Sequence, residues 1–331
     1  MRRWGRWLAL VAGLVIFSVY LAGTDFRAVG ETLRRLGYWA PVLLLPYGVV
    51  YMVDTCAWRF AFEPGLKVSF LRLFRIRWMG ESVNNLVPTA YVGGEAIKVL
   101  FLRREGIPTS AATAAALISK TAQTVGQVLF LILGAGAYLS IRGGGGEQGV
   151  LAGLSLVVLG GCGVVALLLW LQRRGVAAMV YRLLKRLRPA SRRLEARRAA
   201  LEALDETVAG FYRSRRGRFL ACVGGFLLGW MLDTVEVYLA GQLLGLPIRW
   251  SQALVIESFT GVVKIVGLWV PGALGVQESG IVLLSRWVGA PDVFGQTYAL
   301  LRRFRELVYA GIGWAWLGLA GVPVPGEDQS S

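Results

Sequence analysis

Charged side chains stand inside apolar stretches of this sequence, where they need a partner. An unpaired charge at the middle of a membrane costs about 2.5–3.5 kcal/mol on insertion scales. Two acid–base couples share one spacing: Glu95 precedes Lys120 by 25 residues, and Glu278 precedes Arg303 by 25 residues. We expect each carboxylate to pair with its base. A basic group that faces an interior cavity suits a phosphate, which arginine can bind through two parallel hydrogen bonds.

The acidic and amide residues of this set have more than one interpretation. Glu95 and Glu278 each follow a turn, so each could cap the first turn of a helix, where the helix dipole favours a carboxylate. Each could also contact a ligand or carry a proton. Asn84 and Asn85 could line a polar path or hydrogen-bond the backbone of a broken helix. The residue types leave these alternatives open.

Further charges occur inside apolar stretches of the second half. Lys264, Arg302 and Glu306 join the candidate binding residues, because acids and bases are both present and can pair internally. Asp54 and Asp233 are expected to anchor the ends of spans near the membrane interface. The remaining charged residues of this kind are Glu236, Glu257 and Arg305.

An internal repeat places these residues. The segment PTAYVGGE (88–95) matches PGALGVQE (271–278) at an offset of 183, and each sets a proline and a glutamate seven positions apart. Upstream, Met52 to Thr55 resembles Met231 to Thr234 at an offset of 179. The repeat is about 90 residues long. A Gly/Pro break with a carboxylate inside apolar surroundings is the best sequence indication of a binding site in a membrane transporter.

Composition predicts an all-α integral membrane protein. The 331 residues are 55% hydrophobic and only 17% charged, whereas a soluble domain has about 25% charged residues. The sequence contains no histidine, which removes the commonest catalytic base and transition-metal ligand. Its three cysteines have no metal or disulfide spacing, and no nucleotide-binding glycine motif is present. We therefore expect no cofactor, no metal and no enzymatic constellation.

The apolar runs predict about six full spans and two broken, re-entrant helical hairpins. The hairpins occupy 78–102 and 251–288. Three crossings separate them, so they enter from opposite faces and form an inverted repeat. The basic N-terminal flank predicts that both termini are cytoplasmic in a bacterial inner (plasma) membrane. The six spans are 8–23, 38–61, 110–140, 150–171, 219–245 and 296–320.

Residues 173–218 differ from the rest of the chain. They contain 14 Arg or Lys against 4 Asp or Glu, with leucines at roughly helical spacing. This pattern predicts a basic, amphipathic cytoplasmic connector on anionic leaflet lipids. A nucleic-acid partner is not expected, because no recognition motif accompanies the charge. The whole chain is predicted to be one polytopic membrane domain, with repeat one at 38–141 and repeat two at 219–322.

The motifs VPTAYVGGE and VPGALGVQE, the latter followed by LLRRFRE, resemble the lysylphosphatidylglycerol synthase membrane-domain family, also called flippase-like. The resemblance covers about 10–320. It implies two broken-helix repeats around a lipid-sized cavity, and some members of that family translocate aminoacylated phospholipid. The segment ALVIESF is similar to a branch associated with hopanoid biosynthesis. The resemblance supports these site residues: Pro88, Gly93, Gly94, Glu95, Pro271, Gly272, Gly275, Glu278 and Arg303.

The family's synthases carry a large soluble aminoacyl-transfer domain after the membrane part. Only about ten residues follow the last predicted span here, so lysyl-lipid synthesis by this chain alone is not expected. Three functions stay open at this point. The first is a translocase for a lipid or lipid-linked intermediate. The others are a non-transporting lipid-binding partner of a hopanoid or envelope-lipid enzyme, which would dock on the connector, and a lipid-modifying transferase.

Overall fold

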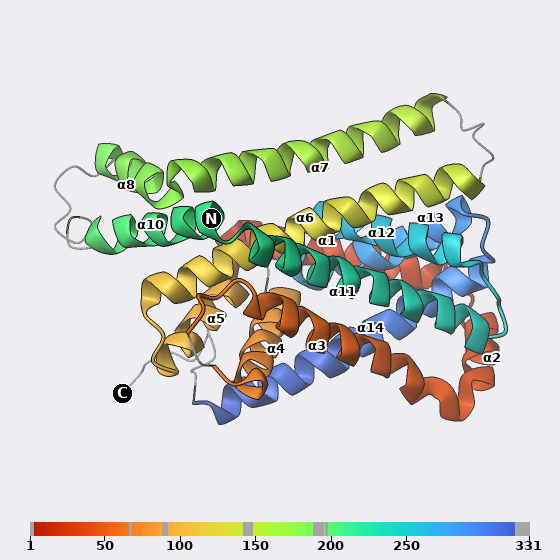
Figure 1. Cartoon of the computed structure of the whole chain (residues 1–331). Helices are drawn as coiled ribbons and strands as arrows, with labels where there is room; N and C mark the ends of the chain where they lie inside the picture. Colours follow the sequence, from red (N-terminus) through yellow and green to blue (C-terminus); the bar gives the residue numbers. More distant parts are fainter. Residues whose placement is uncertain are drawn as a thin grey trace. The chain divides into compact units, whose positions relative to one another are not determined.

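Helices form every regular element that the computed structural model describes, which covers residues 3–65, 68–87, 92–141, 148–187, 195 and 198–321 (Figure 1). No strand occurs in these ranges, and the all-α prediction is confirmed. The first helices are α1 (Arg3–Ala22), α2 (Phe26–Leu36), η1 (Gly37–Leu44), α3 (Leu45–Arg59), α4 (Phe70–Leu86), α5 (Val92–Arg104) and α6 (Thr109–Ile141). The others are α7 (Gln148–Arg174), α8 (Val176–Leu187), α10 (Arg198–Ser214), α11 (Arg216–Leu243), α12 (Trp250–Val266), η2 (Pro271–Ala273), α13 (Val276–Trp287) and α14 (Asp292–Leu319).

Within the described residues, four helical stretches are long and apolar enough to cross a membrane. They correspond to four of the predicted spans, and their bounds are Gly37–Arg59, Thr109–Ile141, Gln148–Arg174 and Arg216–Leu243. The predicted last span coincides with α14, which carries four charged residues near its middle. The predicted first span coincides with α1. Whether α1 and α14 cross the membrane, and whether the repeats are inverted, stay predictions.

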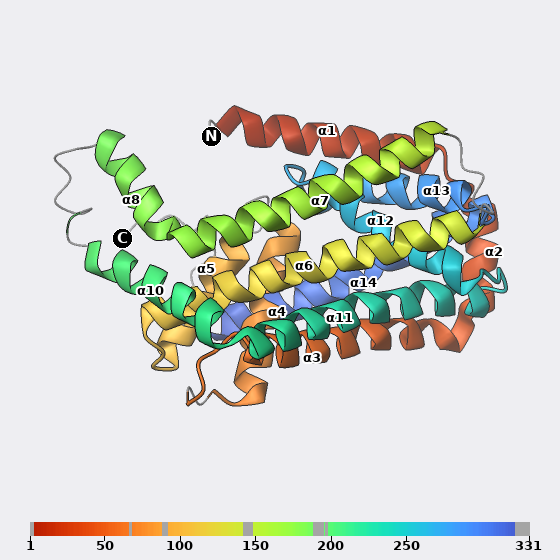
Figure 2. The same cartoon turned by 45° about the horizontal axis from the view of Figure 1, so that its top comes forward.

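The helices fall into two compact units. The first unit contains Met1–Gly48, Ser69–Lys98 and Asp233–Ser331, and the second contains Val49–Val68 and Val99–Leu232. Helix α14 is the central element of the first unit: α4 and α13 pack along it, and α12 packs on α13 (Figures 1 and 2). Helices α1 and α2 contact α13 and α14, respectively. Both broken hairpins therefore lie against one long helix.

Small and aromatic side chains bring α4 and α14 together. A Cβ atom at Gly313 would collide with Ser82, so the two helices approach closely at this point. One turn away, the rings of Trp78 and Tyr309 stack with centroids 4.9 Å apart. Trp78 Nε1 also donates to the backbone oxygen of Tyr309 over 2.7 Å. The close contact fixes the position of α4 relative to the charged middle of α14.

The second broken hairpin turns at a short segment between α12 and α13. Pro271 begins η2, and Gly272 and Gly275 have φ angles of +60° and +78°. Only glycine adopts this region without a steric penalty. The Gly275 N–H donates to Glu278 over 2.8 Å, so Glu278 caps the start of α13. The capping interpretation of Glu278 is confirmed, and the two glycines explain why the helix is interrupted here.

In the first broken hairpin, the two arms α4 and α5 cross in close contact. Helix α4 ends at Leu86 and α5 begins at Val92, and the predicted break at Pro88 lies outside the described residues. The Gly94 N–H donates to Asn84 Oδ1 over 2.9 Å. A Cβ atom at Gly94 would collide with the backbone oxygen of Gly80 and with the side chain of Asn84. The arms of this hairpin are thus in backbone contact.

We expect Gly94→Ala to be destabilising: the methyl group overpacks this crossing, which costs about 1–3 kcal/mol of unfolding free energy before any change in helix propensity. Alanine's own helix propensity opposes this by about 1 kcal/mol. The control is Gly136→Ala in α6, where an added Cβ meets nothing within 4 Å. That variant should be unchanged or more stable. Denaturant unfolding of both variants in nanodiscs tests the crossing, and equal stabilities would contradict it.

The second unit contains α6, α7, α8 and α10, which pack on one another. Gln172 is buried at the end of α7, where it donates to Thr121 over 2.5 Å and accepts from Tyr212 over 2.6 Å. Asp205 of α10 accepts hydrogen bonds from the N–H groups of Ala177 and Ala178, over 2.9 and 2.7 Å. These bonds join α7, α8 and α10, so the predicted connector is helical where it is described.

Helix α8 is amphipathic and solvent-exposed. Its apolar residues Met179, Val180, Leu183 and Leu184 are exposed, beside the basic residues Arg182, Lys185 and Arg186. Lys185 and Tyr181 donate to Glu195, over 2.8 and 2.9 Å. These two hydrogen bonds lower the pKa of the exposed Glu195 carboxyl below its usual value. An exposed helix that is apolar on one side and basic on the other suits the surface of an anionic leaflet.

Candidate functional site

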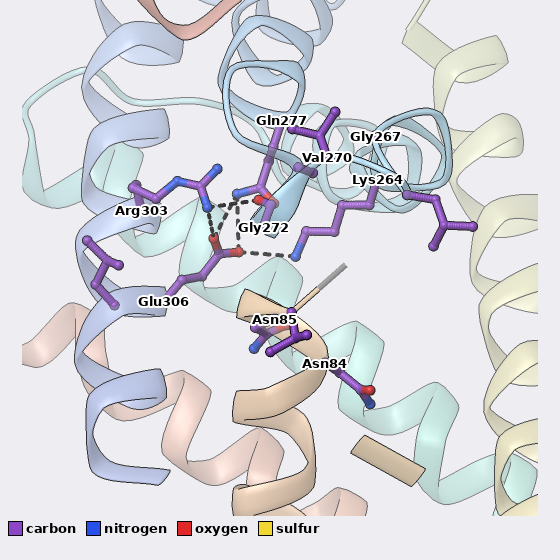
Figure 3. A pocket seen from close by; sticks show the side chains of 13 residues that line it. Asn84, Asn85, Lys264, Gly267, Val270, Gly272, Gln277, Arg303 and Glu306 are labelled. Carbon is purple, nitrogen blue, oxygen red and sulfur yellow. Dashed lines mark hydrogen bonds and ion pairs between the residues drawn. The ribbon is translucent and has the colours of Figure 1, made fainter. Parts of the chain in front are cut away.

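The two broken hairpins meet within the first unit, around a small polar cavity (Figure 3). The backbone oxygen of Asn85, at the end of α4, lies 3.2 Å from the position that a Cβ on Gly272 would occupy. The cavity has a volume of about 40 Å³, which is room for about three water molecules. It is too small for a lipid headgroup in this arrangement. Its polar side chains are Asn84, Asn85, Lys264, Gln277, Arg303 and Glu306.

Glu306 is the centre of the hydrogen-bond network in this cavity. Its carboxylate accepts from Lys264 Nζ over 3.1 Å and from Arg303 Nη1 over 3.2 Å. Gln277 Nε2 donates to both of its oxygens, over 3.1 Å each. Figure 3 shows the three donors converging on this one side chain. An internal carboxylate therefore occupies the place that an external anion could take between two cations.

Arg303 joins this network to the turn of the second hairpin. Its Nη1 donates to the backbone oxygen of Gly272 over 3.0 Å, and its Nε donates to Glu278. The Glu278 side chain is fully buried. The predicted pair of Glu278 and Arg303 is confirmed. One guanidinium group thus connects the helix cap, the turn and the cavity.

Asn84 has both of the roles that the sequence allows. It lines the cavity, and its Oδ1 accepts the hydrogen bond from Gly94 that joins the arms of the first hairpin. Its Nδ2 is buried and has no hydrogen-bond partner among the described residues. A buried amide without a partner carries a desolvation cost. In Figure 3 the Asn84 amide points away from the Glu306 network, toward the first hairpin to which it is hydrogen-bonded.

Arg302, the neighbour of Arg303, belongs to a different set of contacts. It donates twice to Glu257, and the longer of the two bonds is 3.0 Å. Both side chains are almost completely buried. Arg302 does not line the cavity, although its Nε lies 3.7 Å from Glu306. It connects the cavity to a second buried charge cluster.

That cluster also contains Asp233, for which the sequence-based prediction was wrong. Asp233 is 5% exposed and interacts electrostatically with Glu257, Arg305, Arg302 and Glu236. Helix α11 continues to Leu243, so Asp233 is not at a helix end. The spacing of apolar residues could not reveal this position, because the cluster forms where α11 and α12 meet α14, which lies much later in the sequence.

Glu95 has a nearer partner than the one we expected. Lys98, one helical turn later, donates to Glu95 over 2.8 Å and to Glu81 over 2.7 Å. Lys98 is only 3% exposed. Lys120 lies on α6 in the second unit and donates to Gln123 over 3.1 Å. The pairing of Glu95 with Lys120 stays a prediction.

Other predicted site residues are placed as follows. Gly272 lines the cavity, whereas Pro271 and Gly275 shape its turn. Gly93 lies in the first turn of α5, and Pro88 is outside the described residues. Sequence reasoning missed Gln277 and Lys98. Gln277 could have been found as the residue that replaces Gly94 in the repeat, and Lys98 as the base one turn after Glu95.

Within the described ranges, no group of three or more cysteine or acidic side chains is arranged to hold a metal ion. The charged side chains of the cavity instead form acid–base pairs. Hydrogen-bond donors from Lys264, Gln277 and Arg303 line the cavity. This arrangement suits the binding of an anionic group such as a phosphate.

The helices and the buried charges between broken hairpins define an all-α integral membrane protein. The sequence model of the lysylphosphatidylglycerol synthase TM region matches residues 6–313, and the chain belongs to this family. The predicted family is confirmed. A UPF0104 membrane protein from Pyrococcus horikoshii is 21% identical over 319 residues, which cover 90% of this chain and 92% of that protein. The chain is therefore similar to that relative over almost the whole length of both.

Proposed function

We propose that this protein translocates a lipid, or a lipid-linked intermediate of the cell envelope, that carries a phosphate in its headgroup. One observation carries the proposal: two broken hairpins meet at a partly buried site where two cations, Lys264 and Arg303, share one internal carboxylate. Broken helices that meet at buried charges are typical of substrate sites in secondary transporters. The family and its lipid-related name support a lipid as the substrate.

The mechanism exchanges one anion for another. The incoming phosphate would take the hydrogen bonds of Lys264 and Arg303 from Glu306, and the displaced carboxylate would keep its two hydrogen bonds from Gln277. Because the cavity is only about 40 Å³, the tips of the hairpins must separate to admit the headgroup, while the acyl chains stay in the lipid phase. Rocking of one repeat against the other would alternate access.

Lys120, the repeat-related counterpart of Arg303, is also proposed to bind the polar headgroup. We further propose an inner-membrane location with both termini on the cytoplasmic side, where the basic connector would also lie. The proposed cycle has no covalent step. Its candidate substrates are an aminoacylated or other phospholipid, a polyprenyl phosphate and a phosphate-bearing hopanoid.

The test is a leaflet-resolved assay with purified protein in proteoliposomes. Labelled candidate lipids are placed in one leaflet, and their appearance in the other is followed by a membrane-impermeant quencher. We expect faster transfer than in empty vesicles for at least one phosphate-bearing lipid. Rates equal to those of empty vesicles for all candidates would contradict translocation. If purified protein nevertheless retains one lipid class, a non-transporting lipid-binding partner becomes the better function.

We also propose that the connector binds anionic phospholipid at a defined place. A groove of about 680 Å³ lies between the end of α7 and α8, and Arg174, Arg182, Arg186, Trp170 and Met179 are among its lining residues. The Arg174 guanidinium lies 4.6 Å from the centre of the Trp170 ring. Apolar walls with three arginines at the end of an apolar helix match an acyl chain and an anionic headgroup.

The double variant Arg182→Gln/Arg186→Gln should retain about 30-fold less anionic phospholipid, because each basic residue contributes about 1 kcal/mol near an anionic surface. Mass spectrometry of co-purified lipid measures this ratio. The control is Arg286→Gln, an exposed arginine outside the groove. Equal retention by both variants would show that the groove does not select anionic lipid.

A further inference from the structure

A second buried charge cluster lies beside the cavity, and the translocation mechanism above does not use it. Its members come from α11, α12 and α14 of the first unit. Each is at most 5% exposed. Val255 and Ile256, which directly precede Glu257 in α12, are fully buried. The members of the cluster are Asp233, Glu236, Glu257, Arg302 and Arg305.

The two arginines of the cluster already have carboxylate partners. Arg302 holds Glu257 through two hydrogen bonds, and Arg305 donates to Glu236. Tyr298 donates to Glu236 over 3.4 Å and accepts from Arg302 over 3.4 Å. The Arg305 guanidinium also lies over the Tyr47 ring, 3.7 Å from its centre. Each of the two guanidinium groups in the cluster is therefore already paired with a carboxylate.

The third carboxyl group of the cluster, that of Asp233, is not hydrogen-bonded to either arginine among the described contacts. Its Oδ1 is buried and has no hydrogen-bond partner among the described residues. Three carboxyl groups face two guanidinium groups. The other charges nearby are balanced as well, because Lys264 and Arg303 pair with Glu306 and Glu278. A carboxyl group buried without a counter-ion becomes neutral by binding a proton.

The cluster can respond to loss of that proton. Arg305 Nε and Nη2 are buried and have no hydrogen-bond partners within the described part of the chain. An ionised Asp233 could therefore compete with Glu236 for Arg305. The cluster also reaches the cavity, because Arg302 Nε lies 3.7 Å from Glu306. A charge added at Asp233 would therefore act, through Arg302, on the carboxylate of Glu306 that holds the two cations of the cavity.

We propose that Asp233 is a proton-binding site, neutral in this arrangement, and that its proton is linked to the binding of an anionic headgroup in the cavity. The second part rests on the proposed function. The direction of this coupling follows from charge. A proton on Asp233 removes a negative charge that would repel an anion between Lys264 and Arg303, and a bound anion in turn favours the protonated form of Asp233. Proton and anionic lipid therefore favour each other and move together.

The proton itself is tested without any lipid substrate. Infrared spectra of the protein in nanodiscs at neutral pH should contain the carbonyl band of a protonated carboxyl group. Asp233→Asn removes that group and keeps a neutral side chain of nearly the same shape. We expect the band to be lost in this variant and kept in the control Asp292→Asn, which changes an exposed acid. A band that persists in Asp233→Asn, or is absent from the unmodified protein, would overturn the site.

The linkage is tested by titrating a soluble short-chain phosphatidylglycerol, a phosphodiester whose own charge is constant over this range, into the protein at several pH values. With one linked proton, affinity should fall by up to about tenfold for each pH unit at alkaline pH. In Asp233→Asn the affinity should stay constant across that range. The same pH dependence in both proteins would overturn the linkage. Absence of binding at every pH would overturn the proposed function, while the infrared result for Asp233 would stand.

Discussion

Replacing Arg305 with alanine is expected to lower the free energy of unfolding by about 3–5 kcal/mol, because it leaves Glu236 as an uncompensated buried charge. Arg305 is 2% exposed and Glu236 is 3% exposed. The substitution also removes the contact between the Arg305 guanidinium and the Tyr47 ring, whose centre lies 3.7 Å away. Unfolding of the protein in nanodiscs by added denaturant measures the loss.

The matched control for this prediction is Arg286→Ala. Arg286 also pairs with a carboxylate, Asp292, over 2.9 Å, but both side chains are more than half exposed. An exposed pair contributes about 0–1 kcal/mol, so this variant should be close to the unmodified protein. If the two alanine variants lose the same stability, the buried pair is not as isolated from water as the structure indicates.

The same cluster predicts an asymmetry between the two partners. Glu236→Ala should cost less than Arg305→Ala, because Asp233 can release its proton and pair with Arg305 in place of Glu236. No basic residue can replace Arg305 in the same way, since Arg302 is already held by Glu257. Equal costs for the two substitutions would argue against a spare carboxyl group in this cluster.

Lys264→Gln is expected to slow lipid translocation by about 10- to 100-fold. The substitution removes one charged hydrogen bond to the phosphate, and such a bond contributes about 1.5–3 kcal/mol. Stability should change little, because Glu306 keeps its bonds from Arg303 and Gln277. The initial transfer rate in proteoliposomes, measured beside the unfolding free energy, separates the two effects.

Lys185→Gln is the control for this second prediction. Lys185 pairs with Glu195 on the surface of the connector, and both side chains are about half exposed. It removes the same kind of charge at a place distant in sequence from the cavity residues. A translocation rate that is unaffected by Lys264→Gln would exclude this lysine from the headgroup site, and equal slowing by both variants would point to a general effect of net charge.

Local sequence patterns were sufficient to predict most helices and both interruptions. The spacing of prolines, glycines and apolar runs predicted α6, α7 and α11 closely. The 25-residue spacing correctly predicted the pair of Glu278 and Arg303. This succeeded because the partners lie on consecutive helices, α13 and α14, that pack on each other. Because the two repeats keep the same spacing between consecutive helices, the sequence itself indicates which residues of those helices can pair.

The pairs between distant helices could not be predicted in this way. Arg305 with Glu236 and Arg302 with Glu257 depend on the rotation of α11, α12 and α14 about their axes. That rotation is set by packing, which the composition of each helix does not specify. Lys98 shows a second limit, because this base, one turn after Glu95, has no counterpart in the repeat and was not anticipated. A local contact was available that the repeat does not contain.

The carboxylate of Glu306 between Lys264 and Arg303 has a consequence for the empty carrier. Because an internal anion already holds both cations, the unloaded site carries no uncompensated positive charge through the low-dielectric interior. The conformational return without cargo is then no more costly electrostatically than the loaded step. A protein of this design can carry lipid, together with the linked proton, from one leaflet to the other, and it does not require a counter-substrate for obligatory exchange.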